Sequence, residues 1–118
     1  MKHLVNSGRI LCYPSMNEVN YTAFGEVTEE YHDELYGFIF SQGWMNDYEN
    51  GKPQRAYVRV KQDGTLRNET RTLTHYIRDV QHHPENTHNA RYSDVDLAQS
   101  IDEMRQYIEN KLTLTAFV

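Results

Sequence analysis

The feature that most constrains this fold is an apolar stripe near the C-terminus. Its members recur at steps of four, three, four and four residues: Leu97, Ile101, Met104, Ile108 and Leu112. Because an α-helix has ~3.6 residues per turn, this spacing places them all on one face. Ser93 precedes the stripe as an N-cap, and Asp94 and Asp96 supply the acidic first turn that the helix dipole favours. We expect a long amphipathic helix that buries this face against the rest of the chain.

Two further helices are predicted upstream of this stripe. The first begins after Thr28, a residue type that caps helix N-termini, and continues to Gly43. The second spans residues 66–82, and Pro84 ends it because the residue before a proline is displaced from the α region. The apolar residues at helical spacing are Tyr31, Leu35, Phe38 and Ile39 in the first, and Leu66, Leu73, Tyr76, Ile77 and Val80 in the second. The sequence thus predicts three principal helices.

Extended structure is expected in two places. Residues 1–27 carry short runs of β-favouring residues that Gly8, Pro14 and Gly25 interrupt, which is typical of a hairpin or an extended arm. Residues 56–61 alternate between apolar and polar types before a turn sequence at 62–64. This second segment is either a strand or the approach to the following helix.

Length and composition limit the architecture. A chain of 118 residues with 38% hydrophobic residues forms one thin core, because two cores would each bury too little surface. Aromatic residues make up 12% of the chain, which argues against disorder. We predict a mainly α fold: a small three-helix single domain over residues 1–118, with a short β or extended N-terminal arm at 1–27 and a helical body at 28–118.

The charge and the cysteine content indicate the setting. A net charge of −5 repels phosphates, so nucleic acid could bind only at a local basic patch. No apolar run reaches the ~18–20 residues that span a bilayer, and the N-terminus lacks the apolar segment of a signal peptide. The single cysteine, Cys12, cannot form an internal disulfide, which agrees with a reducing compartment. We expect a cytoplasmic protein with no membrane contact.

A cationic stripe is predicted on the second helix. Its members are separated by four, four, three and four residues: Arg67, Arg71, His75, Arg78 and His82. At ~100° per residue they fall within an arc of about 80°, away from the apolar residues of the same helix. Arginine suits phosphate oxygens because its planar donors bind them in pairs. The alternative is a solvated helix face on which Glu69 and Asp79 act as counter-charges.

Arg78, Asp79 and His83 resemble the motif of the HEPN superfamily, the higher eukaryotes and prokaryotes nucleotide-binding domains. In that motif a histidine follows an arginine after four to six residues, and Asn, Asp or His often stands directly after the arginine. A longer resemblance, over about residues 70–110, is to C-terminal segments of bacterial abortive-infection and defence-linked ATPase proteins. It is carried by residues 82–86, 91–94 and 97–101.

The resemblance implies a helical domain that dimerises through the face carrying Arg78 and His83. Arg and His of two subunits would then meet over an RNA phosphate and cleave it without a metal or other cofactor. Arg78, His83 and Asp79 are the catalytic residues on this interpretation, with Asp79 orienting one of the other two. The RNA-binding candidates beside them are Arg67, Arg71, His75, His82 and Asn86. An antitoxin or a defence ATPase is the protein partner that this setting of prokaryotic defence or toxin–antitoxin systems suggests.

The chemistry of these residue types is compatible with that reaction. An imidazole titrates near neutral pH and can take or deliver a proton at the ribose 2′-hydroxyl or the leaving 5′-oxygen. Arginine carries a permanent positive charge that stabilises the developing phosphorane. His83 lies at the predicted helix end, where its side chain is free to turn into a cleft. Asn86, in the following loop, could fold back over the same phosphate, although asparagines before a helix commonly form local turns instead.

A metal site and a non-catalytic interaction module are the alternatives to this interpretation. His75, His82, His83, Glu85 and His88 are possible zinc ligands, but no His-x-x-x-His pair occurs and no metal site is predicted. The other alternative is a non-catalytic interaction module, such as an antitoxin, an inhibitor or a phage-defence subunit. Its anchors would be aromatic residues that could equally pack the core: Tyr31, Tyr36, Trp44, Tyr48, Tyr57 and Tyr107.

Overall fold

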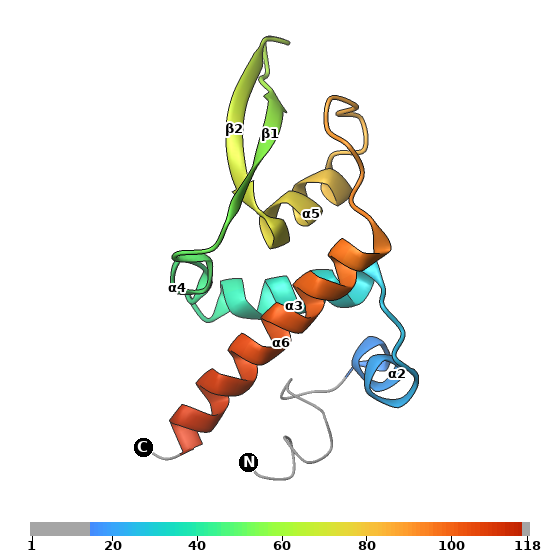
Figure 1. Ribbon diagram of the computed structural model, residues 1–118, viewed down its shortest axis with the longest axis vertical. Coiled ribbons are helices and arrows are strands. Elements are labelled where there is room, and N and C mark those ends of the chain that lie inside the picture. Colours follow the sequence, from blue (N-terminus) through green and yellow to red (C-terminus); the bar gives the residue numbers. More distant parts are fainter. Residues whose placement is uncertain (1–14, 117–118) are drawn as a thin grey trace.

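In the computed structural model, which describes residues 15–116, helices surround one core and a β-hairpin rises from it (Figure 1). The elements in chain order are α2 (Met16–Phe24), α3 (Glu29–Ser41), α4 (Met45–Glu49), β1 (Gln54–Val60), β2 (Leu66–Thr72), α5 (Leu73–His82) and α6 (Asp94–Ala116). The two strands form an antiparallel sheet. The described residues are therefore mainly helical, as predicted.

Packing of α6 against α3 forms the centre of the core. The predicted stripe on α6 is buried: Leu97 is 5% exposed and Ile101, Met104 and Ile108 are fully buried. Leu112 packs against the same cluster at its edge. The predicted caps also hold, because the hydroxyl of Ser93 accepts from the N–H of Asp96, and Thr28 accepts in the same way at the start of α3.

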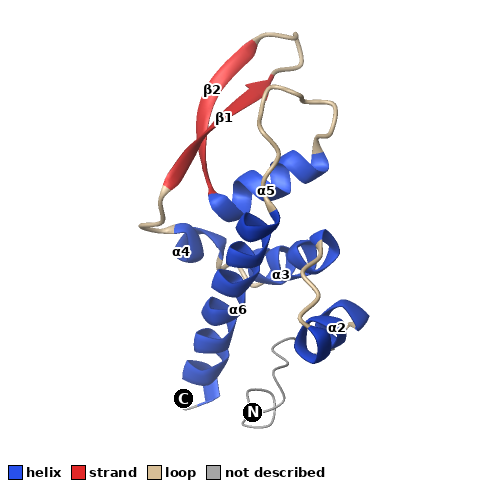
Figure 2. Cartoon of the chain, turned by 45° about the vertical axis from the view of Figure 1, so that its right-hand side comes forward, coloured by secondary structure: helices blue, strands red, loops and turns tan. Residues whose placement is uncertain are grey.

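The prediction of one helix over residues 66–82 is wrong in its first half. Residues 66–72 form β2, which pairs with β1 from Gln54↔Thr72 to Val60↔Leu66. The alternating segment at 56–61 is thus a strand, and the turn at 62–64 connects a hairpin (Figure 2). Between Leu66 and Leu73 the sequence has no apolar residue that could form a helix stripe, so hairpin pairing prevails. The helix begins only where the hydroxyl of Thr72 accepts from the N–H of His75.

The N-terminal arm is also corrected where the structure describes it. Residues 16–24 form α2 rather than extended structure. Ser15 caps its first turn by accepting from the N–H of Glu18, and Gly25 ends it at a φ of 69°, a conformation that glycine adopts without strain. Residues 1–14, including Cys12 and the run around it, lie outside the described residues.

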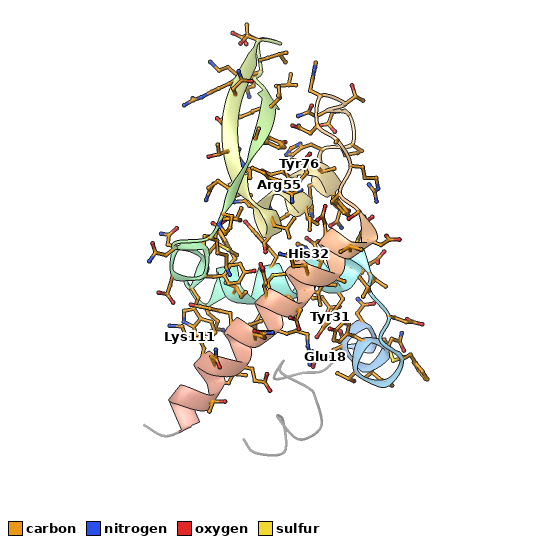
Figure 3. The ribbon with its side chains drawn as sticks, in the orientation of Figure 1. Glu18, Tyr31, His32, Arg55, Tyr76 and Lys111 are labelled. Carbon is orange, nitrogen blue, oxygen red and sulfur yellow. The ribbon has the colours of Figure 1, made fainter. Side chains whose placement is uncertain are left out.

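A charged cluster attaches α2 to the core. Glu18 is fully buried and its carboxylate accepts from the Tyr31 hydroxyl at 3.0 Å (Figure 3). The guanidinium of Arg105 on α6 donates to the same hydroxyl at 2.6 Å and lies 3.8 Å from Glu18. The Arg105 guanidinium also stacks over the ring of Tyr21 at 4.7 Å. Burial of Glu18 is tolerated because its charge is compensated in this way.

A chain of buried polar groups crosses the core and joins four helices. The Nε2 atom of His32 on α3 forms a hydrogen bond with the Ser100 hydroxyl on α6. The Thr74 hydroxyl on α5 lies between the hydroxyls of Ser100 and Tyr48, and each of the three contacts measures 2.7 Å. All four residues are at most 2% exposed. Buried polar groups are tolerated when they are hydrogen-bonded, and such networks specify a single packing. The Nδ1 atom of His32, by contrast, is buried with no partner among the described residues.

The burial of His32 makes the stability of the fold dependent on pH. Desolvation lowers the pKa of His32 to about 4, from 6.5 when exposed. Above pH 6.5 the His32 ring is neutral in both the folded and the unfolded protein, so its titration does not lower the free energy of unfolding there. Stability falls by about 1.4 kcal/mol per pH unit between pH 6.5 and 4, because the unfolded state takes up the proton first.

Urea unfolding of the wild type and of His32→Gln across this range measures the effect. Glutamine can retain the hydrogen bond to Ser100 but does not titrate, and other groups contribute equally to both proteins. The difference in unfolding free energy between the two proteins is expected to change with pH between 6.5 and 4 only. A difference that stays constant over this range would contradict a buried neutral His32.

Candidate nucleic-acid interface

The β-hairpin concentrates the positive charge of an acidic chain. Residues 52–72, here called the basic hairpin, contain six of the twelve Lys and Arg residues but two of the seventeen Asp and Glu residues. The net charge of this segment is therefore +4 (six minus two). The remaining residues carry a net charge of −9, which gives −5 for the whole chain. The hairpin projects from the helical body (Figure 1). It is a local basic patch of the kind that an acidic chain would need to bind nucleic acid.

Strand register places the arginines of the basic hairpin on one face. Directly opposed residues of an antiparallel pair point to the same side, and side chains alternate along each strand. The face comprises three cross-strand pairs, here called the arginine face: Arg55 with Arg71, Tyr57 with Glu69, and Arg59 with Arg67. Four cations thus share one side of a two-stranded ribbon.

Glu69 lies at the centre of this face and holds three of the arginines together. Its carboxylate is 2.5 Å from Nη2 of Arg71, 3.3 Å from Nε of Arg67 and 3.8 Å from Nη1 of Arg59. The hydrogen bond from Arg71, followed by the charges of the three arginines, lowers the pKa of Glu69. One carboxylate leaves a net positive charge on the cluster. The side chains of Arg59 and Arg67 are 57% and 61% exposed and present that charge to solvent.

Arg71 and aromatic packing attach the arginine face to α5. The Nε atom of Arg71 donates to the Asp79 carboxylate at 2.9 Å, and its guanidinium lies over the Tyr57 ring at 4.8 Å. The Tyr57 ring packs edge-on against Tyr76 of α5 at 6.0 Å, and the Arg55 guanidinium lies 5.1 Å from the Tyr76 ring (Figure 3). The hairpin therefore has a fixed position over the helix.

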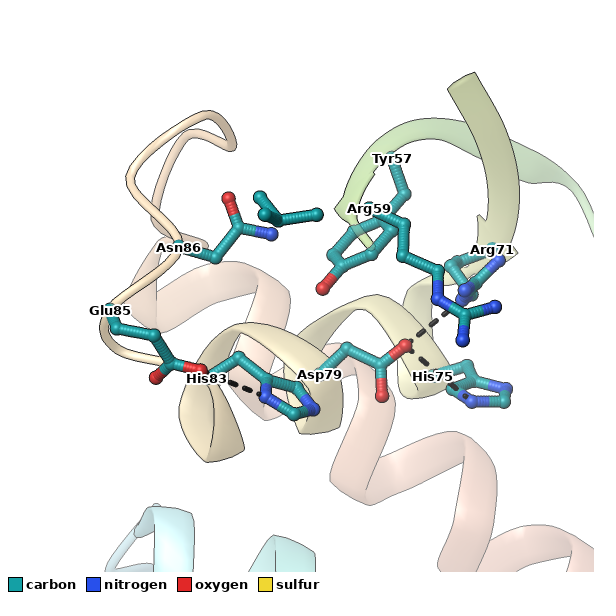
Figure 4. Close-up of a pocket in the computed structure, with 9 residues that line it drawn as sticks. Tyr57, Arg59, Arg71, His75, Asp79, His83, Glu85 and Asn86 are labelled. Carbon is teal, nitrogen blue, oxygen red and sulfur yellow. Dashed lines mark hydrogen bonds and ion pairs between the residues drawn. The ribbon is translucent and has the colours of Figure 1, made fainter. Parts of the chain in front are cut away.

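A pocket of about 500 Å³ opens between the hairpin and α5 (Figure 4). It is lined by Tyr57, Arg59, Val60, Arg71, His75, Asp79, His83, Glu85 and Asn86. The lining combines two guanidinium groups, two imidazoles and two carboxylates. A nucleotide-sized anion would meet donors from both the strands and the helix here.

Each imidazole of the pocket lies beside a carboxylate. The Nδ1 atom of His83 is 3.2 Å from Glu85, and the His83 side chain is 56% exposed. His75 lies between Glu49, at 3.5 Å, and Asp79, at 3.6 Å. The hydrogen bond from His75 lowers the pKa of Glu49. A carboxylate beside an imidazole fixes the orientation of the ring, which is how a histidine that transfers protons is commonly held.

The structure brings two of the predicted catalytic residues, Asp79 and His83, to the pocket, but not Arg78. Asp79 pairs with Arg71 and His75 rather than with Arg78 or His83. Arg78 points toward α3, where its guanidinium stacks over the Tyr36 ring at 4.5 Å. Its Nε atom is buried and has no hydrogen-bond partner within residues 15–116. Residues 78 and 79 are adjacent on α5 and therefore project about 100° apart, which places only Asp79 at the hairpin. Within one chain Arg78 is a packing residue and does not line the pocket.

The predicted cationic stripe is divided between two elements. Arg67 and Arg71 belong to β2, whereas His75 and His82 belong to α5, so the five residues do not share one helix face. Arg71 and His75 still meet at the pocket because β2 leads directly into α5. His82 pairs instead with Asp33 of α3 at 2.9 Å, outside the pocket.

Asn86 has a structural role that the sequence did not indicate. Its side-chain amide donates to the carbonyl of Val58 at 2.9 Å. Asn89 binds the same residue twice, accepting from its N–H at 2.8 Å and donating to its carbonyl at 2.9 Å. The two amides thus occupy the outer edge of β1 and hold the loop after α5 beside it (Figure 2). Asn86 also lines the pocket, so it remains a binding candidate.

The sequence interpretation missed Tyr57, Arg59 and Glu69 as parts of the site. The alternation at 56–61 places residues 57 and 59 on one side of a strand, and a partner strand at 66–72 places Glu69 beside the predicted Arg67 and Arg71. The turn sequence between them supported a hairpin. The four-residue spacing of the cations also fits a helix, so the cations alone do not reveal the hairpin.

The described part of the chain forms neither a metal cluster nor a membrane-spanning helix. Across residues 15–116, no three His, Asp or Glu side chains gather closely enough to hold a metal ion. Within the same range, none of the helices combines the length and apolar character needed to cross a membrane.

Among comparisons with known proteins, no family model, curated protein or solved structure matches this chain significantly. The resemblance to HEPN domains therefore stays a prediction.

The role of Arg71 in attaching the hairpin to α5 can be tested by measuring the free energy of unfolding. Arg71→Ala removes its bonds to Asp79 and Glu69 and leaves both carboxylates in a partly buried site, so the unfolding free energy is expected to fall by about 2 kcal/mol. Arg67→Ala is the matched control, because its exposed ion pair is expected to change the value by less than about 0.5 kcal/mol. Urea unfolding measures both. Equal effects of the two substitutions would show that Arg71 does not hold the hairpin on α5.

Proposed function

We propose that this protein binds RNA in the groove between the basic hairpin and α5. The observation that carries the proposal is the gathering of arginine and histidine side chains at one pocket in a chain that is acidic elsewhere. Arg59 and Arg67 offer exposed guanidinium groups to phosphate oxygens, and such contacts supply most of the affinity for nucleic acid. The acidic remainder of the chain limits binding to this surface.

Single-stranded RNA is the substrate class that the pocket favours. Unpaired bases stack on exposed rings and on guanidinium planes, and the pocket supplies both from His75, His83 and Arg59. Asn86 adds an amide that can donate to a base edge or a ribose hydroxyl beside its bond to Val58. The 2′-hydroxyl is also the group on which an imidazole in the pocket can act.

The same groove supports metal-independent cleavage, the reaction that the HEPN resemblance implies. His83, oriented by Glu85, would take the proton from the ribose 2′-hydroxyl. The 2′-oxygen then attacks phosphorus, and the bond to the 5′-oxygen breaks as His75 delivers a proton to it. The products are a 2′,3′-cyclic phosphate and a 5′-hydroxyl end. Arg59 would stabilise the phosphorane in the place that the motif assigned to Arg78.

This assignment keeps the proposed setting in prokaryotic defence or toxin–antitoxin systems, which the motif of Arg78, Asp79 and His83 suggests. It changes the residues that act. Arg78 supports α5 through Tyr36, and the hairpin supplies the cations. The observation that supports this change is that Arg59 lines the pocket with His83, whereas Arg78 does not.

Binding is tested with a fluorescently labelled single-stranded RNA by anisotropy over a range of salt concentrations. Arg59→Ala is expected to weaken binding and to reduce the slope of log affinity against log salt by about 0.7–0.9, the value for one lost phosphate contact. Arg91→Ala is the matched control, because it removes one exposed cation that pairs with Glu29 away from the hairpin. Equal losses in both variants would show that only the net charge matters and would contradict a site on the hairpin.

Cleavage is tested on total RNA and on a defined oligonucleotide in the presence of EDTA. His83→Ala is expected to lower the cleavage rate at saturating RNA roughly 10²–10⁴-fold, the contribution of a general base. His88→Ala is the control, since this exposed histidine lies in the same loop and does not line the pocket. RNA binding without cleavage by the wild type would leave the binding function and contradict the enzyme. Cleavage that persists in His83→Ala at the wild-type rate would contradict the assigned base.

A further inference from the structure

The two edges of the hairpin differ in how their main-chain groups are used. Asn86 and Asn89 occupy the N–H and carbonyl of Val58, so these groups point away from β2. Val58 stands opposite Asn68 in the register. In an antiparallel pair, opposed residues either bond to each other or both point outward. The N–H and carbonyl of Asn68 therefore point outward from β2, on the edge that lies away from the loop (Figure 1).

The outward-pointing groups of β2 belong to every second residue, namely Leu66, Asn68 and Thr70. The Thr70 carbonyl accepts from the Arg71 guanidinium at 2.9 Å and retains a second lone pair. No main-chain hydrogen bond joins Asn68 to the described residues outside the hairpin. Such an edge is a template for pairing with another strand.

We propose that β2 pairs with β2 of a second copy of this chain, antiparallel and centred on Asn68. In this register Asn68 faces Asn68 of the second copy, and Leu66 faces Thr70. Arg67 faces Glu69 of the second copy, and by symmetry Glu69 faces its Arg67. Opposite charges directly across a strand pair are stabilising, so the sequence around Asn68 is complementary to itself.

The neighbouring registers are unfavourable. A pairing centred on Glu69 would oppose the two Glu69 carboxylates and set Arg67 against Arg71. A pairing centred on Arg67 would oppose the two Arg67 side chains. Both would also place inward-pointing main-chain groups at the new junction, because outward groups occur only at every second residue. Like charges and main-chain phase thus exclude both centres next to Asn68.

The proposed pairing produces a four-stranded sheet with strand order β1-β2-β2-β1. Directly opposed residues point to one side of a sheet, so the arginine faces of the two copies lie side by side. Pairing through β2 does not require the proposed RNA binding, although two arginine faces side by side would offer RNA two adjacent grooves. It places the dimer interface on β2 and not on the surface of Arg78 and His83 that the HEPN resemblance implies.

Site-specific cross-linking tests the register. Asn68→Cys in a Cys12→Ser background is expected to form a disulfide-linked dimer under mild oxidation. The two residues would be a bonded pair with Cα atoms ~5.5 Å apart, within disulfide range. Leu66→Cys in the same background is the matched control and should stay monomeric on non-reducing gels, since Leu66 of the two copies would lie four residues out of register. Cross-linking of Leu66→Cys to the same extent, or none of Asn68→Cys, would overturn the proposal.

Sedimentation of the oxidant-free proteins tests the edge itself. Asn68→Pro removes the outward N–H, which β1 does not use, and is expected to raise the dimer dissociation constant at least about tenfold. Asn68→Ala retains the main-chain N–H and should dimerise as the wild type does. Circular dichroism confirms that both variants are folded. A wild type that sediments as a monomer at all concentrations, or a dimer that survives Asn68→Pro, would refute pairing through β2.

Discussion

The direct passage from β2 into α5 determines where every other part of the site lies. No residue separates the two elements, because β2 ends at Thr72 and α5 begins at Leu73. Thr72 is 2% exposed and is held on both sides: its hydroxyl caps α5 by accepting from the His75 N–H, and donates to Glu49 of α4 at 2.6 Å. The hairpin therefore cannot swing freely, and Arg71 is set beside Asp79.

The groove is the result of this junction together with two attachments further along the hairpin. Tyr57 packs on Tyr76, and the asparagine side chains of residues 86 and 89 hold β1 at Val58. These contacts are aromatic and polar, whereas the apolar core lies beneath α5, between α3 and α6. A thin core thus supports a projecting charged ribbon, which explains how an acidic chain with modest hydrophobic content can present a positive face.

The helical core was predictable because its signals are periodic and local. The α6 stripe, the Thr28 cap and the end of α5 before Pro84 all follow from residues within one or two turns. The four-residue spacing of Arg67, Arg71 and His75 was ambiguous, because a strand that leads into a helix can carry the same spacing. Residues 66–72 form a strand because they pair with β1, and this contact joins two separate segments of the chain. The buried link from His32 to Ser100 spans 68 residues and has no local signature at all.

The chemical assignment changed with the fold. The motif implies that Arg78 and His83 act on one phosphate, but Arg78 packs on Tyr36 of α3 and the hairpin contacts Asp79 instead. Titration of the ¹⁵N-labelled protein with a short single-stranded RNA tests the resulting claim most directly. The account predicts that amide shifts concentrate on the hairpin and α5, at Tyr57, Arg59, Arg71, His75 and His83. Shifts confined to α3 and α6, or no shifts at all, would contradict it.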